Sequence, residues 1–383
     1  MAHPPWCAGG AKERRVELNP SAQATPHPRW LRVAAIVLGS LALALFFQCP
    51  RLWIFSQPVP GSVYWDRGLQ FIQQCDAPLG APLADAALAW RVAPVLLAKT
   101  LALHGRAALA VPWIGLVLLL AQCAWVMAAR TRDWRAAAFT TALIATTGAT
   151  ATVTSWLGIN DAWYAAALVA IALQPSAGLL LLAAAIGPWV DERFILALPL
   201  ALWVRHQALG AAGRIRVATF AAAASIGAYL ALRLGNVLHL SGASSEGYWR
   251  YVLGGIPAWW PWVSLGWFMG LRAAWVWVAV AIGGGWRKDE RRAAWFPALL
   301  AAAPLAVMSV LASDTSRSPT MLLPLVLFGV ERFIALRGIE PAIRIARFLL
   351  VANLLMPAMN VTYRNADPVN MLPVELARWA RVR

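Results

Sequence analysis

Asp66 and Arg67 stand side by side in the stretch VYWDRGLQF, a few residues after a long apolar segment. A carboxylate can accept a proton from a hydroxyl group, and a guanidinium can bind a phosphate through two parallel hydrogen bonds. Tyr64 and Trp65, which precede the pair, are residue types that favour the boundary between a membrane and water. The stretch therefore predicts either chemistry at that boundary or, because Asp favours helix starts, an N-cap at Asp66.

Further charged residues lie where apolar runs begin or meet. Asp161 begins one such run, and Asp191, Glu192 and Arg193 separate two runs without an ordinary loop. Charges this close to hydrocarbon usually pair with one another or face a cavity. All four residues are therefore candidates for binding a substrate. The alternatives are an N-cap at Asp161 or Asp191 and a self-paired turn at the triplet.

Asp314, Arg317 and Arg272 complete the candidate binding residues. Ser318 and Pro319 predict the start of a helix, so Asp314 and Arg317 are not needed for capping and can form either a local ion pair or part of a site. Arg272 lies near the middle of a long apolar run, where an Arg costs at least about 2.5–3.5 kcal/mol. We expect it to face the interior of a helix bundle, although snorkelling or contact with an anionic group are alternatives.

The composition places these residues in a membrane protein. The chain has 383 residues, 60% of them hydrophobic and 13% charged, whereas soluble domains carry about a quarter charged residues. Long continuous apolar runs predict membrane-spanning helices, so we expect an all-α polytopic integral membrane protein with about eleven spans (roughly nine to thirteen). The runs are 31–47, 107–129, 136–155, 161–173, 177–190, 194–204, 214–233, 262–285, 293–312, 318–336 and 343–358.

The net charge of +16 is explained by topology, so we expect no nucleic-acid partner. If the N-terminus is cytoplasmic, the inner connections hold 13 basic residues and the short outer connections hold 4. This asymmetry predicts a multi-pass protein of the inner (plasma) membrane. Of the 33 basic residues only 3 are Lys, which together with the abundant Ala suggests a GC-rich bacterial genome.

The chain divides into three parts. We expect a cytoplasmic N-terminal tail at 1–30, a transmembrane domain at 31–358 and a short C-terminal tail at 359–383. The transmembrane domain includes a long outer loop at 48–106.

Two juxtamembrane helices are predicted within that outer loop, over 65–76 and 85–104. In the first, one face carries apolar side chains and the other carries polar ones. The apolar face is Trp65, Leu69 and Ile72, and the polar face is Asp66, Gln70, Gln73 and Gln74.

The four cysteines show no metal-binding spacing, so a structural zinc site is not expected. Cys49 and Cys75 share the outer loop. Free thiols are the default for them, and a disulfide is the alternative.

This arrangement resembles the C-type membrane glycosyltransferases, which use polyprenyl-phosphate sugars. In that family the first outer loop forms juxtamembrane helices and supplies a catalytic acid, and Asp66 in YWDRG occupies that position. The resemblance implies a lipid-linked sugar donor, contact with membrane lipids, Asp66 as the base and an Arg at the phosphate. Arg67 stands where the family has a second acid. We expect no cofactor, and a divalent metal is the alternative.

Two other classes stay open. A transporter or flippase of a lipid or small solute could line its path with the same charges, and the short runs within 161–204 would suit broken helices. The absence of an internal repeat argues against that class. A non-catalytic membrane assembly partner is the third alternative.

Overall fold

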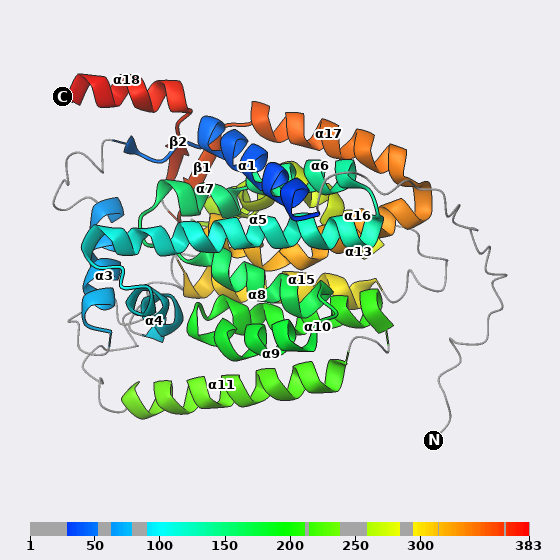
Figure 1. Cartoon of the computed structure of the whole chain (residues 1–383), viewed down its shortest axis with the longest axis horizontal. Coiled ribbons are helices and arrows are strands. Elements are labelled where there is room, and N and C mark those ends of the chain that lie inside the picture. Colours follow the sequence, from blue (N-terminus) through cyan, green and yellow to red (C-terminus); the bar gives the residue numbers. More distant parts are fainter. Residues whose placement is uncertain are drawn as a thin grey trace.

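The computed structural model describes residues 29–52, 63–78, 90–210, 214–237, 259–283, 294–312, 314–363 and 365–382. Almost all of them are helical (Figure 1). The first half contains α1 (Arg29–Phe47), α3 (Val63–Asp76), α4 (Val92–Thr100), η3 (Gly105–Leu109), α5 (Ala110–Thr131), α6 (Trp134–Ala145), α7 (Gly148–Ser155), α8 (Asp161–Leu173), α9 (Ala177–Ile186), η4 (Gly187–Trp189) and α10 (Arg193–Leu209).

The second half continues the same pattern and ends in a hairpin. It contains α11 (Ile215–Val237), a helix over 259–271, η6 (Arg272–Ala274), α13 (Trp275–Gly283), α15 (Trp295–Leu311), η7 (Thr315–Leu322), α16 (Leu323–Arg337), α17 (Ile339–Leu355), the strands β1 (Ala358–Val361) and β2 (Ala366–Val369), and α18 (Leu372–Val382). The strands pair antiparallel, with Ala358 opposite Val369.

The described residues of the eleven apolar runs are mostly helical, but the runs do not amount to eleven long spans. Within the described residues, five helices are long and apolar enough to cross a membrane: Arg29–Phe47, Gly105–Thr131, Ile215–Gly235, Trp259–Gly283 and Thr315–Arg337. Three further apolar helices are shorter. The difference arises because several runs are interrupted. The run 136–155, for example, is divided into α6 and α7 at Thr146 and Thr147.

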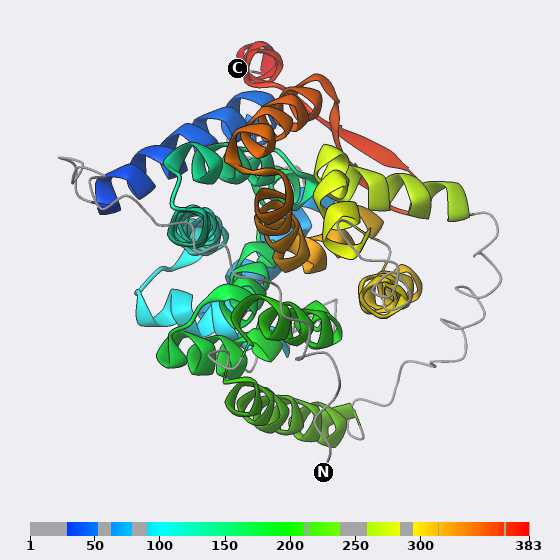
Figure 2. The same ribbon diagram turned by 90° about the vertical axis from the view of Figure 1, so that its right-hand side faces the viewer.

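The helices pack around a shared core, and they differ in how much of their surface is buried. Large side chains such as Trp277, Tyr164 and Phe194 are fully buried, and so is most of α8. In contrast, only 22% of the apolar window of α1 and 17% of that of α11 is buried. Figure 2 shows α11 at the edge of the bundle. The exposed apolar faces of these two helices are what lipid contact requires.

The two ends of the bundle have different chemical characters. α3, α4, the hairpin and α18 gather at one end, on the left of Figure 1. The segment at 359–383, expected to be a short tail, is therefore folded onto this end, because Asn360 hydrogen-bonds Thr152 and Ser155. The opposite end carries the α5–α6 and α16–α17 connections with their arginines.

The juxtamembrane helix is confirmed as α3, but its buried face differs from the predicted one. Phe71, Ile72 and Cys75 are buried together with Gln74, whereas Leu69 is 38% exposed. Packing against the rest of the bundle, and not the polarity of each residue, decides this face. The second expected helix, 85–104, is described only from residue 90 and is helical over Val92–Thr100. Cys49 and Cys75 are free thiols.

Arginines stabilise several helix ends inside the molecule. Carbonyl groups in the last turn of a helix have no partner within that helix, and they carry a partial negative charge. A guanidinium satisfies both needs. The bonds are Arg205 to Ile171 and Gln174, Arg130 to Ala208, Arg332 to Ala281, and Arg272 to Thr146 and Asn353. These arginines therefore have a structural role.

Candidate functional site

Asp161 and Arg317 form the centre of a buried cluster at the end of the bundle that carries α3. Asp161 is the first residue of α8 and Arg317 lies in η7. The Arg317 Nε and Nη2 atoms lie 2.7 and 2.6 Å from the two carboxylate oxygens of Asp161. The side chains are only 6% and 1% exposed. Asp161 does not cap its helix, since no side-chain cap bond is present at the start of α8.

Arg317 also contacts Asp314, as the local ion pair expected from the sequence. Its Nη1 atom lies 3.3 Å from Asp314 Oδ2. The predicted helix start at Ser318 is wrong, because residues 315–322 form a 3-10 helix and α16 begins at Leu323. This tight helix keeps Asp314 and Arg317 on one face, three residues apart.

Asp191 joins three arginines. Its carboxylate lies 3.0 Å from Arg91, 3.2 Å from Arg193 and 3.9 Å from Arg317, and it accepts the backbone N–H of Arg193 at 3.0 Å. Burial alone raises the pKa of a carboxyl group, but here the guanidinium groups outweigh it. The pKa of Asp191 is therefore held well below its usual range.

Glu192 extends the cluster toward α11. It receives hydrogen bonds from Arg91 at 3.0 Å and from Arg233 at 2.7 Å. Arg233 also donates to Tyr229 at 2.6 Å. We call the eight charged residues the ion network: Arg91, Asp161, Asp191, Glu192, Arg193, Arg233, Asp314 and Arg317. Four are arginines and four are carboxylates, so the network is neutral when all are ionised.

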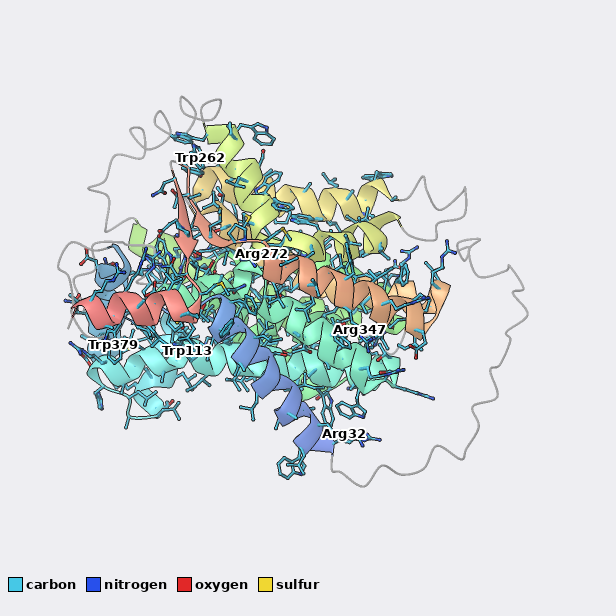
Figure 3. All side chains as sticks on the ribbon, turned by 90° about the horizontal axis from the view of Figure 1, so that it is seen from above. Arg32, Trp113, Trp262, Arg272, Arg347 and Trp379 are labelled. Carbon is cyan, nitrogen blue, oxygen red and sulfur yellow. The ribbon has the colours of Figure 1, made fainter. Side chains whose placement is uncertain are left out.

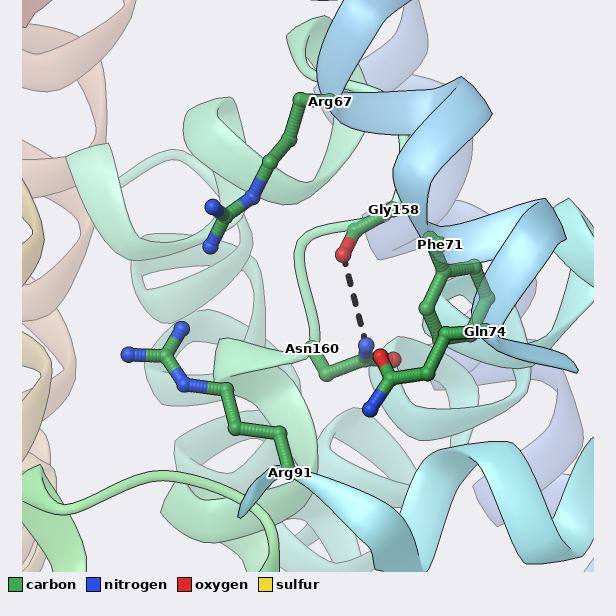
Figure 4. Close-up of a pocket in the computed structure, with 6 residues that line it drawn as sticks. All are labelled: Arg67, Phe71, Gln74, Arg91, Gly158 and Asn160. Carbon is green, nitrogen blue, oxygen red and sulfur yellow. Dashed lines mark hydrogen bonds between the residues drawn. The ribbon is translucent and has the colours of Figure 1, made fainter. Parts of the chain in front are cut away.

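A small pocket, with room for about one water molecule, adjoins the ion network. Its lining residues are Arg67, Phe71, Gln74, Arg91, Gly158 and Asn160. The side chains of Arg67 and Arg91 extend to the same side of it (Figure 4). Gly158 has φ +75°, and a side-chain carbon there would lie 2.8 Å from Phe71, so only glycine fits this turn against α3.

Several buried polar atoms beside the network and the pocket have no hydrogen-bond partner. They are Arg91 Nε, Arg193 Nε, Tyr164 Oη, Asn160 Oδ1 and Asp314 Oδ1. Buried polar atoms are usually satisfied by protein, water or a ligand. This end of the bundle therefore offers donors and acceptors to a polar molecule.

The structure separates Asp66 and Arg272 from the ion network. Asp66 is half-buried in the first turn of α3 and does not line the pocket, although Arg67 beside it does. It is not the N-cap, because α3 begins three residues earlier at Val63. Arg272 is 2% exposed, so the expectation that it faces the interior is confirmed. Figure 3 shows it near the middle of the molecule.

Six of the predicted site residues come together in the ion network, and two members of the network were not predicted. Asp161, Asp191, Glu192, Arg193, Asp314 and Arg317 all belong to the network. Arg91 and Arg233 were missed as members. Arg233 stands at the edge of an apolar run, as Arg193 does, whereas Arg91 lies inside the expected helix 85–104, where the sequence does not connect it with Asp191. Asp85 and Glu246, which the sequence also places on the outer side, lie outside the described residues.

No metal cluster is found in the described part of the chain, where no three His, Cys, Asp or Glu side chains gather closely enough. The fold and composition define an all-α membrane protein. No family model, no curated protein and no solved structure matches the chain.

Proposed function

We propose that this chain is a membrane glycosyltransferase that takes a sugar from a polyprenyl-phosphate donor, at the end of the bundle that holds the ion network. The observation that carries the proposal is the pocket lined by both Arg67 and Arg91. Both arginines come from the segment between α1 and α5, the predicted outer loop. In this proposal that end faces the outside of a plasma membrane, with the N-terminus in the cytoplasm.

Two guanidinium groups in one pocket suit a phosphate that becomes a leaving group. Arg binds phosphate oxygens in pairs, and such charge-assisted bonds strengthen as negative charge develops. Arg91 is anchored by Asp191 and Glu192 through its terminal nitrogens, whereas its buried Nε has no partner. The carboxylates thus fix the position of Arg91, and the pocket receives the donor phosphate.

Asp161 and Asp191 of the ion network are poor candidates for the base. Both oxygens of Asp161 are bonded to Arg317, and the low pKa of Asp191 makes it a weak proton acceptor at neutral pH. Asp66 stands outside the network and next to Arg67, so it remains the proposed base.

Transfer of labelled sugar in membrane vesicles tests the proposal. Asp66→Asn removes the proton acceptor with little change in shape, so we expect activity to fall about 10²- to 10⁴-fold. Arg67→Gln should weaken use of the donor, while Lys99→Gln, at an exposed cation of the same segment, should leave transfer unchanged. Thermal unfolding in detergent is the control for folding. Full transfer by the Asp66→Asn variant would exclude Asp66 as base.

Transport remains a second candidate because helices are interrupted inside the bundle. The breaks at Thr146–Thr147 and at Arg272 lie within apolar runs. Transporters commonly place their binding sites at such breaks. Uptake of a labelled lipid or solute by vesicles, with no transfer of sugar, would favour this class.

A further inference from the structure

Three irregular segments meet in the interior of the bundle. They are the break between α6 and α7, the break at η6, and the 3-10 helix η7. A side-chain carbon on Gly148 would lie 2.5 Å from the carbonyl oxygen of Met269, and one on Gly270 would lie 2.7 Å from that of Ser316. The backbones are therefore in direct contact. Non-helical backbone at membrane depth is tolerated where it is buried in protein or lines a polar site.

Arg272 occupies this junction in an unusual state. Its φ is +51°, a left-handed conformation that is strained for any residue with a side chain. The guanidinium Nη1 atom donates to the carbonyl oxygens of Thr146 at 3.0 Å and Asn353 at 3.1 Å. These bonds cap the end of α6 and the last turn of α17, but they use only one of the three nitrogens.

The remaining nitrogens form an unused binding edge. Nε and Nη2 of Arg272 are buried and have no hydrogen-bond partner. They are the same two nitrogens with which Arg317 holds both oxygens of Asp161. No carboxylate of the described residues pairs with Arg272, so a buried cation is left without a counter-charge. Burying a charge without a partner is costly, and an anion at this edge would relieve the cost.

We propose that the Nε–Nη2 edge of Arg272 binds a small inorganic monovalent anion, such as chloride, inside the bundle. The close approach of the three backbone segments favours an ion of this size over a lipid headgroup. The site is separate from the Arg67–Arg91 pocket, and it does not depend on the function proposed for that pocket. A single water molecule bridging to the unpartnered Gln48 Oε1 is the competing occupant.

Thermal unfolding of the full chain in detergent tests the site, with chloride replaced by gluconate at constant ionic strength. Binding to the folded state raises the unfolding temperature, here by at least about 2 °C in chloride. Arg272→Lys keeps a cation that can donate to the two carbonyl oxygens. Lys lacks the planar Nε and Nη2 pair, so the rise in unfolding temperature in chloride should disappear. Arg205→Lys is the matched control, since Arg205 is also fully buried and bonded to helix-end carbonyls, and it should retain the effect.

Bromide gives a direct measurement on the unchanged protein. In crystals grown with bromide, we expect an anomalous peak beside Nε and Nη2 of Arg272. A water molecule or no density at that edge overturns the proposal, even if Arg272→Lys fails to fold. Equal unfolding temperatures of the unsubstituted protein in chloride and gluconate overturn it as well.

Discussion

At the scale of single residues, Arg is used for two purposes, and only the first needs its planar pair of donors. In the ion network the planar guanidinium group donates two hydrogen bonds to one carboxylate, as Arg317 does to Asp161. Elsewhere the same group reaches two carbonyl oxygens at once, as Arg205 does at the end of α8. These contacts account for arginines that charge counting assigns only to topology.

The loss of stability at low pH should depend on Asp191. Its folded-state pKa is lower than the usual 3.8 because burial is outweighed by three arginines. A depressed pKa contributes stability that is complete above the unfolded value and is lost as pH falls through the folded value. The unfolding temperature should therefore hold between about pH 5 and pH 7 and fall below about pH 4.

Asp191→Asn separates this contribution from general acid denaturation. At neutral pH the variant leaves buried arginines without part of their counter-charge, which should cost about 3–5 kcal/mol. The gap in unfolding temperature between the two proteins should narrow as pH falls below about 4, because the Asp191 carboxyl group takes up a proton in the unfolded chain while it stays ionised in the folded protein. Unfolding temperatures measured from pH 7 to pH 3 give the comparison. A gap that widens in acid would contradict the assignment.

At the scale of elements, short interrupted helices bring polar groups into an apolar bundle. α7 has 8 residues and η7 also has 8, and neither crosses the bundle alone. Their ends expose backbone groups that Thr, Ser and Arg side chains satisfy, such as Thr147 Oγ1 with the Ile144 carbonyl at 2.7 Å. The buried hydroxyl groups of Thr146, Thr147 and Thr150 therefore serve the break between α6 and α7.

Gly270→Ala tests the contact between the irregular segments. The added methyl would lie 2.5 Å from Pro319 and 2.7 Å from the Ser316 carbonyl oxygen. Such overlap should destabilise the protein by about 1–3 kcal/mol. Gly227→Ala is the matched control, because nothing lies within 4 Å of its new carbon and Ala favours helix. Thermal unfolding of both variants makes the test, and equal stability would show that the junction is looser than described.

At the scale of the whole molecule, the bundle has one end with the pocket and ion network and another with the exposed basic connections. The pocket end contains α3, α4, the hairpin and α18 (Figure 1). Of the four basic residues predicted for the short outer connections, Arg193, Arg233 and Arg317 are ion-paired with carboxylates. Their positive charge is thus neutralised locally, as is that of Arg130 and Arg135 at the opposite end.

The position of the C-terminus gives a test of topology. α17 runs from the basic end to the pocket end, and α18 follows the hairpin there. A reporter fused to the C-terminus should therefore be external, whereas reporters fused after Gly210 and Gly338 should be cytoplasmic. Alkaline phosphatase and green fluorescent protein fusions distinguish the two sides. An internal C-terminus with an internal residue 338 would contradict this path of the chain.

Much of the architecture could be predicted from the sequence because its causes are local. Apolar composition and length predict helices in a membrane, and the described parts of the apolar runs are mostly helical. The juxtamembrane helix α3 follows from its periodicity, although not its buried face. The interruption at Arg272 was not predicted, because the sequence marks this Arg as a charge in an apolar run without showing that the helix breaks there.

The ion network shows most clearly what could not be predicted from the sequence. The sequence by itself determined which residues are charged near an apolar boundary, since residue type and spacing are properties of the chain. Only the tertiary structure decided which of them meet: Asp161 and Arg317 are 156 positions apart and form a bidentate pair, whereas Asp66 lies outside the network. The physical reason is that an ion pair depends on a separation of a few ångströms between side chains, which the packing of helices sets and residue order does not.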